Sequence, residues 1–356
     1  MRVLLAGAWQ WPWYEEACAT VLGDLGHEVM PFSWFGAFFR SQVGAARPEF
    51  RSRSLGLQYR LLAGPRVDRI NRDLVKMVED GRPDMLLLYR APMVQASALK
   101  AIKRRHPSLI LTEYCNDDPF SPAANALLWR HLKRSIPVFD IHFVFRSRNL
   151  QDFRHAGARR VHMLRGYYVP WFHHPVDPDT QDPRFACDVA FAGHYERDWR
   201  IKALARLAAT NAGTRLYGAG WDRASSAEKR QLGSLLPTSI VAGEDYRQAV
   251  CGARIGLCFL SSLNRDTYTT RSFEIPAMGV FLLSQYTSDL ASLFEEGREI
   301  AFFRTPDELL TKVAYYLEHE DERRVMARNG RERVRRDGHD VTSRMREMMS
   351  VIETMS

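Results

Sequence analysis

The stretch from residue 2 to residue 33, "RVLLAGAWQWPWYEEACATVLGDLGHEVMPFS", decides the fold class. A short apolar run ends in Gly7, and a helix-length segment over residues 14–25 stops at Gly26. The segment "HEVMPF", residues 27–32, is typical of a second strand. Strand, glycine loop, helix and strand within about 32 residues predict a βαβ unit.

The same alternation continues to residue 164. Near-continuous apolar runs predict strands at residues 84–90, 109–115, 140–145 and 159–164. Amphipathic segments between them predict helices at residues 66–80, 93–106, 122–134 and 147–156. Strands that are apolar on both faces are typical of a parallel sheet covered by helices on both sides.

Residues 165–185 interrupt this pattern with four prolines and no periodicity, which is typical of a linker. A second α/β series follows. It has predicted strands at 187–193, 214–220, 254–261 and 280–284, and predicted helices at 196–210, 244–253, 288–296 and 305–320. One or two arginine-rich helices end the chain.

We therefore expect an α/β protein of two doubly wound Rossmann-like domains that face each other across a cleft. The predicted boundaries are residues 1–168 for the first domain, 169–186 for the linker and 187–338 for the second domain. Residues 339–356 are predicted to form a C-terminal helix, and one expected arrangement has this helix packed back on the first domain.

Composition narrows the function classes. The 356 residues carry a net charge of +8, which suits nucleic acid, a membrane surface or a phosphorylated small molecule. The longest apolar runs are strand-sized, so we expect no transmembrane helix. Five scattered cysteines predict neither disulfides nor a zinc site and favour the cytoplasm, with the inner face of the membrane as an alternative place. The absence of a G-x-G-x-x-G motif after a strand argues against a dinucleotide-dependent enzyme.

Two loops of the second half follow predicted strands and suit an anionic ligand. "AGHYERDWR", residues 192–200, offers Gly193 for close backbone approach and the side chains of His194, Arg197 and Arg200 as donors. "LYGAGW", residues 216–221, offers Gly218 and Gly220 for close backbone approach and the flat face of Trp221 for stacking on a base or ring. The alternatives are a surface loop with solvated charges for the first and a tight turn with a core tryptophan for the second.

A third loop is rich in hydroxyl groups. Asp266 and Glu274 are eight residues apart, and the residues between them include Tyr268, Thr269, Thr270 and Arg271. Backbone N–H groups and hydroxyls before a helix suit a diphosphate, and the Glu274 carboxylate can accept both hydroxyls of a ribose diol. Glu274 lies between apolar neighbours and needs such donors. The alternative is an i, i+3 ion pair with Arg271.

The block from residue 271 to residue 334 resembles the C-terminal half of glycosyltransferases of the GT-B architecture, most closely the branch related to the CgeB spore-maturation proteins. The shared order is R-x-F-E-I-P-A-x-G, an apolar strand, F-x-x-G-x-E-I, an aromatic strand, D-E-L and a Y-Y-L helix. The resemblance covers about residues 187–340. It is weaker in the first half, which offers "EYCNDDPF" at residues 113–120.

The resemblance implies transfer of a hexose or deoxyhexose from a UDP- or GDP-activated donor in glycan biosynthesis, without a metal or other cofactor. The acceptor is a glycan, a protein or a small molecule. In retaining members two acids form an E-x7-E motif. The second acid falls on Glu274 and the first on Asp266, which would face the donor sugar and is an aspartate here. Arg197 or Arg200 would face the pyrophosphate, and positioned cations would stabilise the leaving diphosphate.

The acceptor is expected on the first domain. Its candidate residues are Gly7, Trp9, Trp11, Trp13, Tyr14, Arg90 and Asn116, with Asp117 or Asp118 as a general base. The alternatives are a hydrophobic contact for the tryptophans and a simple Asp-Asp-Pro turn for the aspartates. A non-catalytic protein that binds a nucleotide or glycan is the alternative function. Peripheral membrane contact is an open expectation, and we expect no nucleic-acid partner because no recognition motif is present.

Overall fold

The computed structural model describes residues 1–41 and 48–355. The chain divides into two compact units, one formed by Met1–Gly166 with Val341–Ser356 and the other by Tyr167–Asp340. Each unit is an α/β sandwich built on one parallel sheet. The predicted fold class is therefore confirmed at the level of two Rossmann-like sheets.

The sheet of the first unit has, among the described residues, six parallel strands in the order β2-β1-β3-β4-β5-β6. Their bounds are β1 (Arg2–Gly7), β2 (Glu28–Ser33), β3 (Met85–Tyr89), β4 (Ile110–Cys115), β5 (Ile141–Val144) and β6 (Val161–Met163). Because β1 lies between β2 and β3, the chain changes direction across the sheet at the β1–β3 boundary. This is the switch point where open α/β sheets bind ligands.

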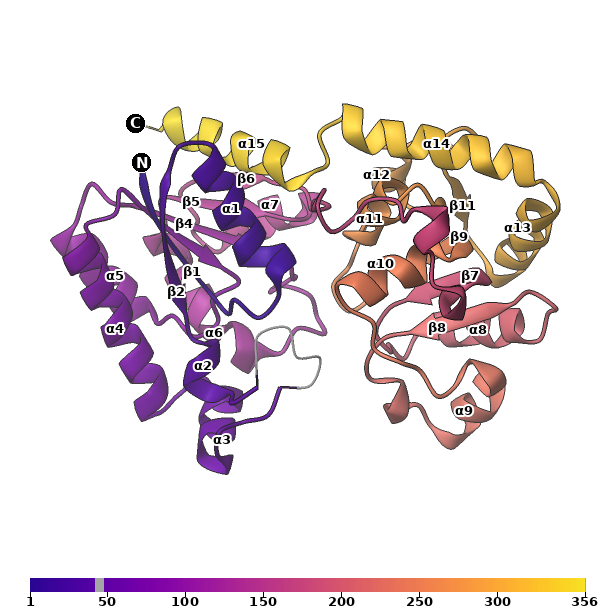
Figure 1. The fold of residues 1–356 in the computed structure, drawn as a ribbon. Helices are drawn as coiled ribbons and strands as arrows, with labels where there is room; N and C mark the ends of the chain where they lie inside the picture. Colours follow the sequence, from indigo (N-terminus) through magenta and orange to yellow (C-terminus); the bar gives the residue numbers. More distant parts are fainter. Residues whose placement is uncertain (42–47, 356) are drawn as a thin grey trace. The chain divides into compact units, whose positions relative to one another are not determined.

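Helices cover both faces of this sheet. α1 and α15 contact each other on one face, and α4 and α5 contact each other on the opposite face (Figure 1). On α4 the core side chains Val67, Ile70, Leu74 and Val78 recur at helical spacing. The helices of this unit are η1 (Pro12–Glu16), α1 (Ala17–Asp24), α2 (Phe35–Phe38), α3 (Arg53–Leu61), α4 (Pro65–Gly81), α5 (Ala96–Arg105), α6 (Ala126–Ser135), η2 (Ile136–Val138), α7 (Ser147–His155) and α15 (Val341–Glu353).

The sheet of the second unit has, among the described residues, five parallel strands in the order β11-β10-β9-β7-β8. These are β7 (Cys187–Ala192), β8 (Thr214–Tyr217), β9 (Ala253–Cys258), β10 (Phe281–Gln285) and β11 (Ala301–Phe303). The switch point of this sheet lies between β7 and β9. The loops after these two strands are the predicted ligand loops at residues 193–199 and 259–270.

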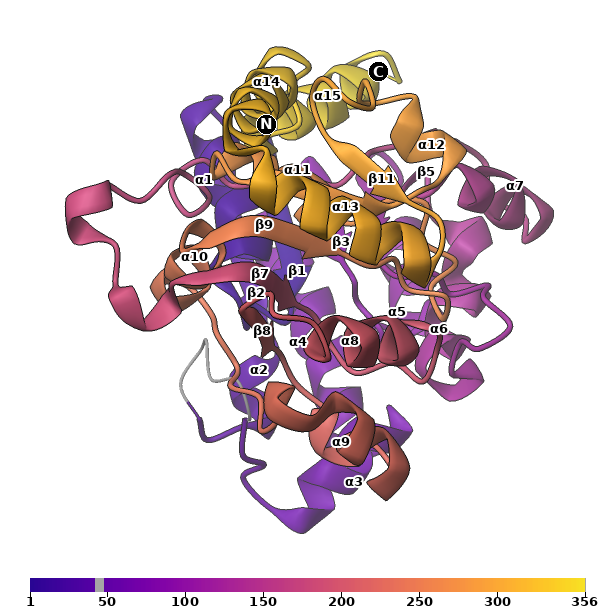
Figure 2. The same ribbon diagram turned by 90° about the vertical axis from the view of Figure 1, so that its right-hand side faces the viewer.

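The helices of the second unit also form two layers. α8 and α13 contact each other on one face (Figure 2), and α11 contacts α14 on the other. The bounds are η3 (Pro178–Thr180), η4 (Pro183–Phe185), α8 (Arg200–Ala208), η5 (Trp221–Arg223), α9 (Ser226–Leu232), η6 (Gly233–Leu235), α10 (Glu244–Cys251), α11 (Arg271–Ala277), α12 (Ser288–Ala291), α13 (Pro306–Glu318) and α14 (Glu320–Arg336).

The segment expected to be a linker, residues 169–186, is assigned to the second unit. Asp177 and Asp182 each cap a short turn that begins with proline. Gln248 on α10 then accepts a hydrogen bond from the backbone N–H of Asp182 at 2.9 Å, and the Gln181 side chain donates to the Gln248 carbonyl at 3.1 Å. The segment is therefore built onto α10.

The sequence analysis missed three short helices, α2, α3 and α9, and placed the start of α8 too early. Asp198 accepts the backbone N–H of Arg200 at 3.0 Å and so fixes the helix start there. α9 begins with a capping box between Ser225 and Glu228, a signal that the sequence did contain.

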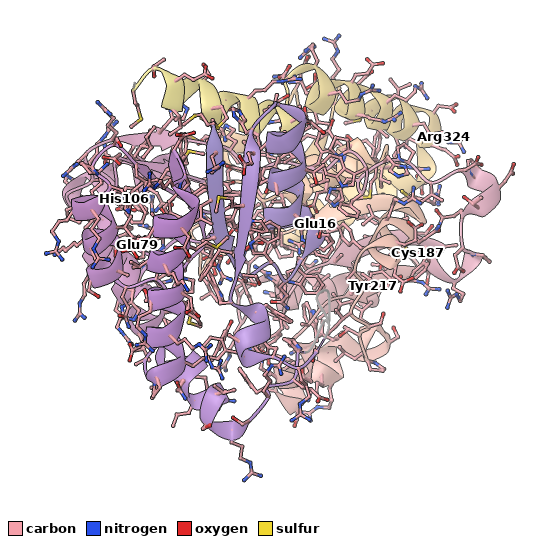
Figure 3. All side chains as sticks on the ribbon, turned by 60° about the vertical axis from the view of Figure 1, so that its left-hand side comes forward. Glu16, Glu79, His106, Cys187, Tyr217 and Arg324 are labelled. Carbon is pink, nitrogen blue, oxygen red and sulfur yellow. The ribbon has the colours of Figure 1, made fainter. Side chains whose placement is uncertain are left out.

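The surface carries the charges that the composition requires. Charged side chains cover the outer faces of the helices, and Figure 3 labels Glu79 on α4 and Arg324 on α14 among them. None of the helices in the described residues is long and apolar enough to cross a membrane.

An ionisable pair, Glu113 and His142, is buried in the core of the first unit. His142 Nδ1 on β5 lies 3.0 Å from Glu113 Oε2 on β4, and its Nε2 donates to the Ile136 carbonyl at 3.1 Å. Both side chains are buried. Burial raises the pKa of Glu113, and the hydrogen bond from His142 opposes this.

We expect Glu113→Ala to lower the free energy of unfolding of the first unit by about 3–5 kcal/mol, because it leaves His142 buried without its partner. Urea unfolding followed by circular dichroism measures the change. As a control, Asp73→Ala removes an exposed i, i+4 partner of Arg69 and should change the value by less than about 0.5 kcal/mol. Equal effects of the two variants would contradict the role given to the buried pair.

Candidate functional site

The loops after β7 and β8 pack backbone against backbone. Gly193 N–H donates to the Tyr217 carbonyl at 2.9 Å, and Tyr195 N–H donates to the Ala219 carbonyl at 3.0 Å. Gly218 has φ +126°, and a Cβ added there would collide with the Gly193 carbonyl oxygen. Gly218 therefore allows the two loops to approach each other, and the missing side chain of Gly193 makes room for the ring of Phe191.

Trp221 lies in the core of the second unit and does not present a face to a ligand. Its side chain is 1% exposed, and its Nε1 donates to the Gly193 carbonyl at 2.9 Å. The prediction that Trp221 stacks on a base is wrong for this structure, and the alternative of a tight turn with a core tryptophan is correct. Gly220, with φ +84°, forms the turn that brings the tryptophan inward.

His194 lies at the surface beside β7, in strongly basic surroundings. Partial desolvation of the imidazole lowers the pKa of His194, because the charged form of the ring loses hydration. The guanidinium groups of Arg271, Arg223 and Arg200 lower this pKa further. A neutral imidazole beside several fixed cations suits a ligand with more than one negative charge. The sequence analysis named His194, Arg200 and Arg271 but missed Arg223, which follows the Gly220 turn.

Arg200 and Arg197 differ in what they can do. Arg200 is buried, and its guanidinium binds Asp198 through two hydrogen bonds of 2.8 and 2.9 Å and Glu196 at 3.1 Å. It therefore holds the loop and would have to leave these carboxylates to reach a phosphate. The Arg197 side chain is 85% exposed, and its Nε lies 4.0 Å from Glu228.

The hydroxyl-rich loop is held in place by its own groups. Thr269 N–H donates to Ser272 Oγ at 3.2 Å, and the Thr270 carbonyl accepts the N–H groups of Phe273 and Glu274 at 2.9 Å. Tyr268 is 0% exposed and packs against Phe273 with ring centroids 5.5 Å apart. The prediction that Tyr268 contacts a ligand is therefore wrong for this structure.

Asp266 and Arg271 belong to the same loop. Asp266 N–H donates to the Ser261 carbonyl at 2.9 Å, and the Asp266 carboxylate acts electrostatically on Glu196 and Cys258. Arg271 acts on His194, Cys258 and Tyr246 in the same way. The structure thus brings together side chains from the loops that follow β7, β8 and β9.

Glu274 is buried on α11 with partners from other elements. Its Oε2 accepts the Tyr246 hydroxyl at 2.7 Å, and its Oε1 lies 4.0 Å from His173 Nε2. The sequence analysis weighed a ligand or Arg271 as the partner and missed Tyr246 and His173. No short-range motif joins residues 173, 246 and 274, so only the tertiary fold reveals the cluster.

In the first unit, the carboxyl ends of β1, β3 and β4 carry the predicted acceptor residues. Arg90 and Asp117 form an ion pair, and Trp11 and Trp13 stack with centroids 4.9 Å apart. Tyr14 packs near Tyr89, with centroids 5.8 Å apart.

Asp118 is a structural residue. It is 2% exposed, and its Oδ1 accepts the N–H of Phe120 and the side chain of Asn149, both at 2.9 Å. These contacts match the alternative of an aspartate turn, and a direct catalytic role for Asp118 stays a prediction. Asp117, half-buried beside Arg90, stays a candidate.

Two polar atoms of this region, Trp9 Nε1 and Asn116 Oδ1, are buried and have no hydrogen-bond partner among the described residues. The Asn116 carbonyl accepts a hydrogen bond from Arg146 at 3.0 Å, which fixes the backbone beneath the side chain. Groups of this kind are suited to a polar ligand.

Glu15 is a feature that the sequence analysis missed. Its buried carboxylate accepts backbone N–H groups of Ala8 and Trp9, and burial raises its pKa. A Cβ on Gly7 would collide with this carboxylate. Gly7 thus makes room for Glu15, and the loop that carries the tryptophans is tied to the helix that follows it.

Among the described residues, no group of three or more His, Cys, Asp or Glu side chains is placed to hold a metal ion.

Comparison with known proteins agrees with the fold described above. Residues 197–350 match the family model described as glycosyl transferase-like. The structure resembles a sucrose-phosphate synthase from Thermosynechococcus elongatus, with a TM-score of 0.71, 12% identity, and 100% of this chain and 99% of that chain covered. It also resembles HepE from Anabaena in complex with UDP and glucose, with a TM-score of 0.67, 13% identity, and 99% and 100% of the two chains covered.

A third similar structure is an α,α-trehalose 6-phosphate synthase from Burkholderia multivorans, with a TM-score of 0.62, 12% identity, and 100% and 99% of the two chains covered. None of the curated proteins compared with the sequence matches it. The fold is GT-B, and the resemblance to GT-B glycosyltransferases is confirmed.

We expect Gly218→Ala to destabilise the second unit by about 2–4 kcal/mol, because the added methyl meets a carbonyl oxygen and the backbone is left-handed there. Gly297→Ala is the matched control, since Gly297 has φ +80° but open space around it, and should cost about 1 kcal/mol. Guanidinium unfolding of both variants measures the difference. A Gly218 variant no weaker than the control would contradict the close approach of the two loops.

Proposed function

We propose that this chain transfers a sugar from a nucleoside diphosphate sugar to an acceptor. The observation that carries the proposal is the basic cluster around His194 at the switch point of the second unit. Arg223 and Arg271 are contributed by two different loops, and both act on the same imidazole. Arg223 and Arg271 lie within residues 197–350, which match the glycosyl transferase-like family model, and His194 lies three residues before that match.

The chemistry proposed for this cluster is electrostatic. When the bond between the sugar and the diphosphate breaks, negative charge develops on the leaving phosphate. Arginine side chains that are already in position stabilise that charge without reorganisation. Arg200 acts indirectly, because its two carboxylate partners fix the loop that carries His194.

The nucleoside is proposed to be held by Glu274. A carboxylate oxygen has two lone pairs, so Oε2 can accept a ribose hydroxyl in addition to the Tyr246 hydroxyl. The HepE structures contain UDP, UDP with glucose, and UDP-glucose, which makes UDP the first donor nucleotide to test here. GDP is the second.

The acceptor is proposed to bind the first unit. The stacked pair Trp11 and Trp13 offers an aromatic surface to a sugar ring, and the buried polar atoms of Trp9 and Asn116 offer hydrogen bonds. Asp117, held by Arg90, is the remaining candidate base. A glycan, a protein side chain and a small molecule all supply a suitable nucleophile.

Several finer points belong to the proposal. They are a hexosyl or deoxyhexosyl donor, transfer without a metal, retention of configuration, and a place in the cytoplasm or at the inner face of the membrane. Retention of the anomeric configuration is proposed because this chain resembles enzymes with an E-x7-E motif. Asp266 of this chain stands where that motif has its first glutamate. Analysis of the anomeric configuration of the product by NMR tests it.

A thermal-shift screen with UDP, GDP and dTDP, followed by donor hydrolysis assays with the matching sugars, tests the proposed function. A shift with one nucleotide and slow release of its sugar are expected. No response to any of the three would contradict the proposal. Binding without hydrolysis or transfer, unchanged by Asp117→Ala, would favour the alternative of a non-catalytic binding protein.

We expect Glu274→Ala to weaken binding of the nucleotide about 10- to 100-fold, because a hydrogen bond to a charged group is worth about 1.5–3 kcal/mol. Glu274→Gln, which keeps an acceptor for Tyr246, should weaken binding with little loss of melting temperature. Isothermal titration calorimetry and thermal unfolding measure the two quantities. Glu322→Ala is the control, since Glu322 accepts the Tyr315 hydroxyl away from the site. Loss of stability without loss of affinity would assign Glu274 a structural role.

A further inference from the structure

The carboxylate of Glu274 is the meeting point of three elements. Glu274 itself lies on α11, the Tyr246 hydroxyl comes from α10, and the His173 imidazole comes from the segment that opens the second unit. The hydroxyl donates to Oε2 at 2.7 Å, and the imidazole Nε2 lies 4.0 Å from Oε1. The two oxygens thus face different protein groups.

The hydrogen-bonding roles of these groups are fixed. Val169 N–H donates to His173 Nδ1 at 2.9 Å, so the proton of the neutral ring is on Nε2, the atom that faces Glu274. Burial lowers the pKa of His173 and raises the pKa of Tyr246 well above its ordinary value, so the ring stays neutral and the hydroxyl keeps its proton at neutral pH. Both groups therefore present a hydrogen to the carboxylate.

His173 is held on the second unit by its neighbours as well. The Arg247 guanidinium on α10 lies 2.9 Å from His174 Nδ1, and it is oriented by Glu244 through hydrogen bonds of 2.8 and 2.9 Å. Tyr246 and Arg247 are adjacent on α10, so the same helix supplies the hydroxyl and fixes the backbone beside the imidazole. The ring of His173 also meets the ring of Tyr246 edge-on, with centroids 6.0 Å apart.

A carboxylate that accepts a hydrogen bond at Oε2 and faces an imidazole N–H 4.0 Å from Oε1 is restricted in its rotation. Its remaining lone pairs then point in set directions, and two vicinal hydroxyls can bind without an entropic loss for ordering the side chain. A ligand that lacks these hydroxyls gains nothing from the arrangement. Tyr246 and His173, as partners of Glu274, therefore affect the affinity for a ligand through the hydroxyls that the Glu274 carboxylate binds.

We propose that Tyr246 and His173 are positioning residues that aim the Glu274 carboxylate at the ribose diol and so make the site selective for ribonucleotides. This inference rests on the proposed function. It adds two residues that lie 28 and 101 positions from Glu274 in the chain, and it states which part of the donor they recognise.

The test compares UDP with 2′,3′-dideoxy-UDP on the full chain by calorimetry. Tyr246→Phe removes one hydroxyl and keeps the ring. We expect it to weaken UDP binding about 5- to 20-fold and to change 2′,3′-dideoxy-UDP binding by less than about 2-fold. In transfer assays the KM for the UDP-sugar should rise by the same factor as the UDP dissociation constant, with kcat nearly unchanged.

Tyr315→Phe is the matched control, because it also removes a tyrosine hydroxyl that donates to a glutamate, Glu322, at 2.8 Å. It should leave both affinities unchanged. His173→Gln, which keeps a donor near the position of Nε2, should preserve more of the ribose preference than His173→Ala. These two variants test the inference independently of Tyr246→Phe.

Equal weakening of UDP and 2′,3′-dideoxy-UDP by Tyr246→Phe would overturn the inference and leave the proposed function intact, since the residue would then act on the fold of the whole site. Unchanged affinity for both ligands would overturn it too. If the wild-type chain bound none of UDP, GDP and dTDP, the proposed function itself would be contradicted.

Discussion

Burial of a carboxylate is the constraint on which the organisation of both units depends. A charged group taken out of water must be met by donors or share a proton, otherwise it destabilises the fold. Glu113 lies 3.0 Å from the His142 imidazole in the core, and Glu15 accepts backbone N–H groups after β1. Glu274 accepts the Tyr246 hydroxyl. Of these three acids, only Glu274 is tied to a residue next to the basic cluster, since Arg271 acts on Tyr246 and His194 alike.

The second constraint is the close approach of loops at the carboxyl edge of the second sheet. Gly218 lets the two backbones come within hydrogen-bonding distance, and Trp221 donates from the core to the Gly193 carbonyl. The backbone N–H groups of Gly193 and Tyr195 donate to carbonyls of the neighbouring loop. A ligand would therefore be bound mainly by side chains that project from these loops. This explains why the candidate phosphate site is made of arginines and an imidazole instead of a glycine-rich cradle.

The sequence predicted the fold well because periodicity and apolar runs are local signals. Ten of the eleven β-strands in the described part of the chain, the alternation with helices and the loops that follow β7, β8 and β9 could be read from these signals, while β11 is expected only from the family resemblance. The sequence did not reveal the role of residues whose type is common both in ligand sites and in cores or turns. Trp221, Tyr268 and Asp118 are types that bind ligands, but here they fill a core or hold a turn. Burial separates the two uses, and burial is a property of the tertiary structure.

The expected linker shows the same ambiguity in its backbone. Aspartate followed by proline is typical of a flexible connection, but the pair also supplies a cap and a preset first residue for a short turn. Asp177 and Asp182 each cap a short turn that begins with proline. Gln248 on α10 accepts the backbone N–H of Asp182 and so holds this segment on the helix. Once the segment is fixed, His173 within it can be placed against Glu274 with a defined tautomer. The proline-rich stretch is thus a part of the candidate donor site, and its ordering is what allows a residue 101 positions away to aim the carboxylate.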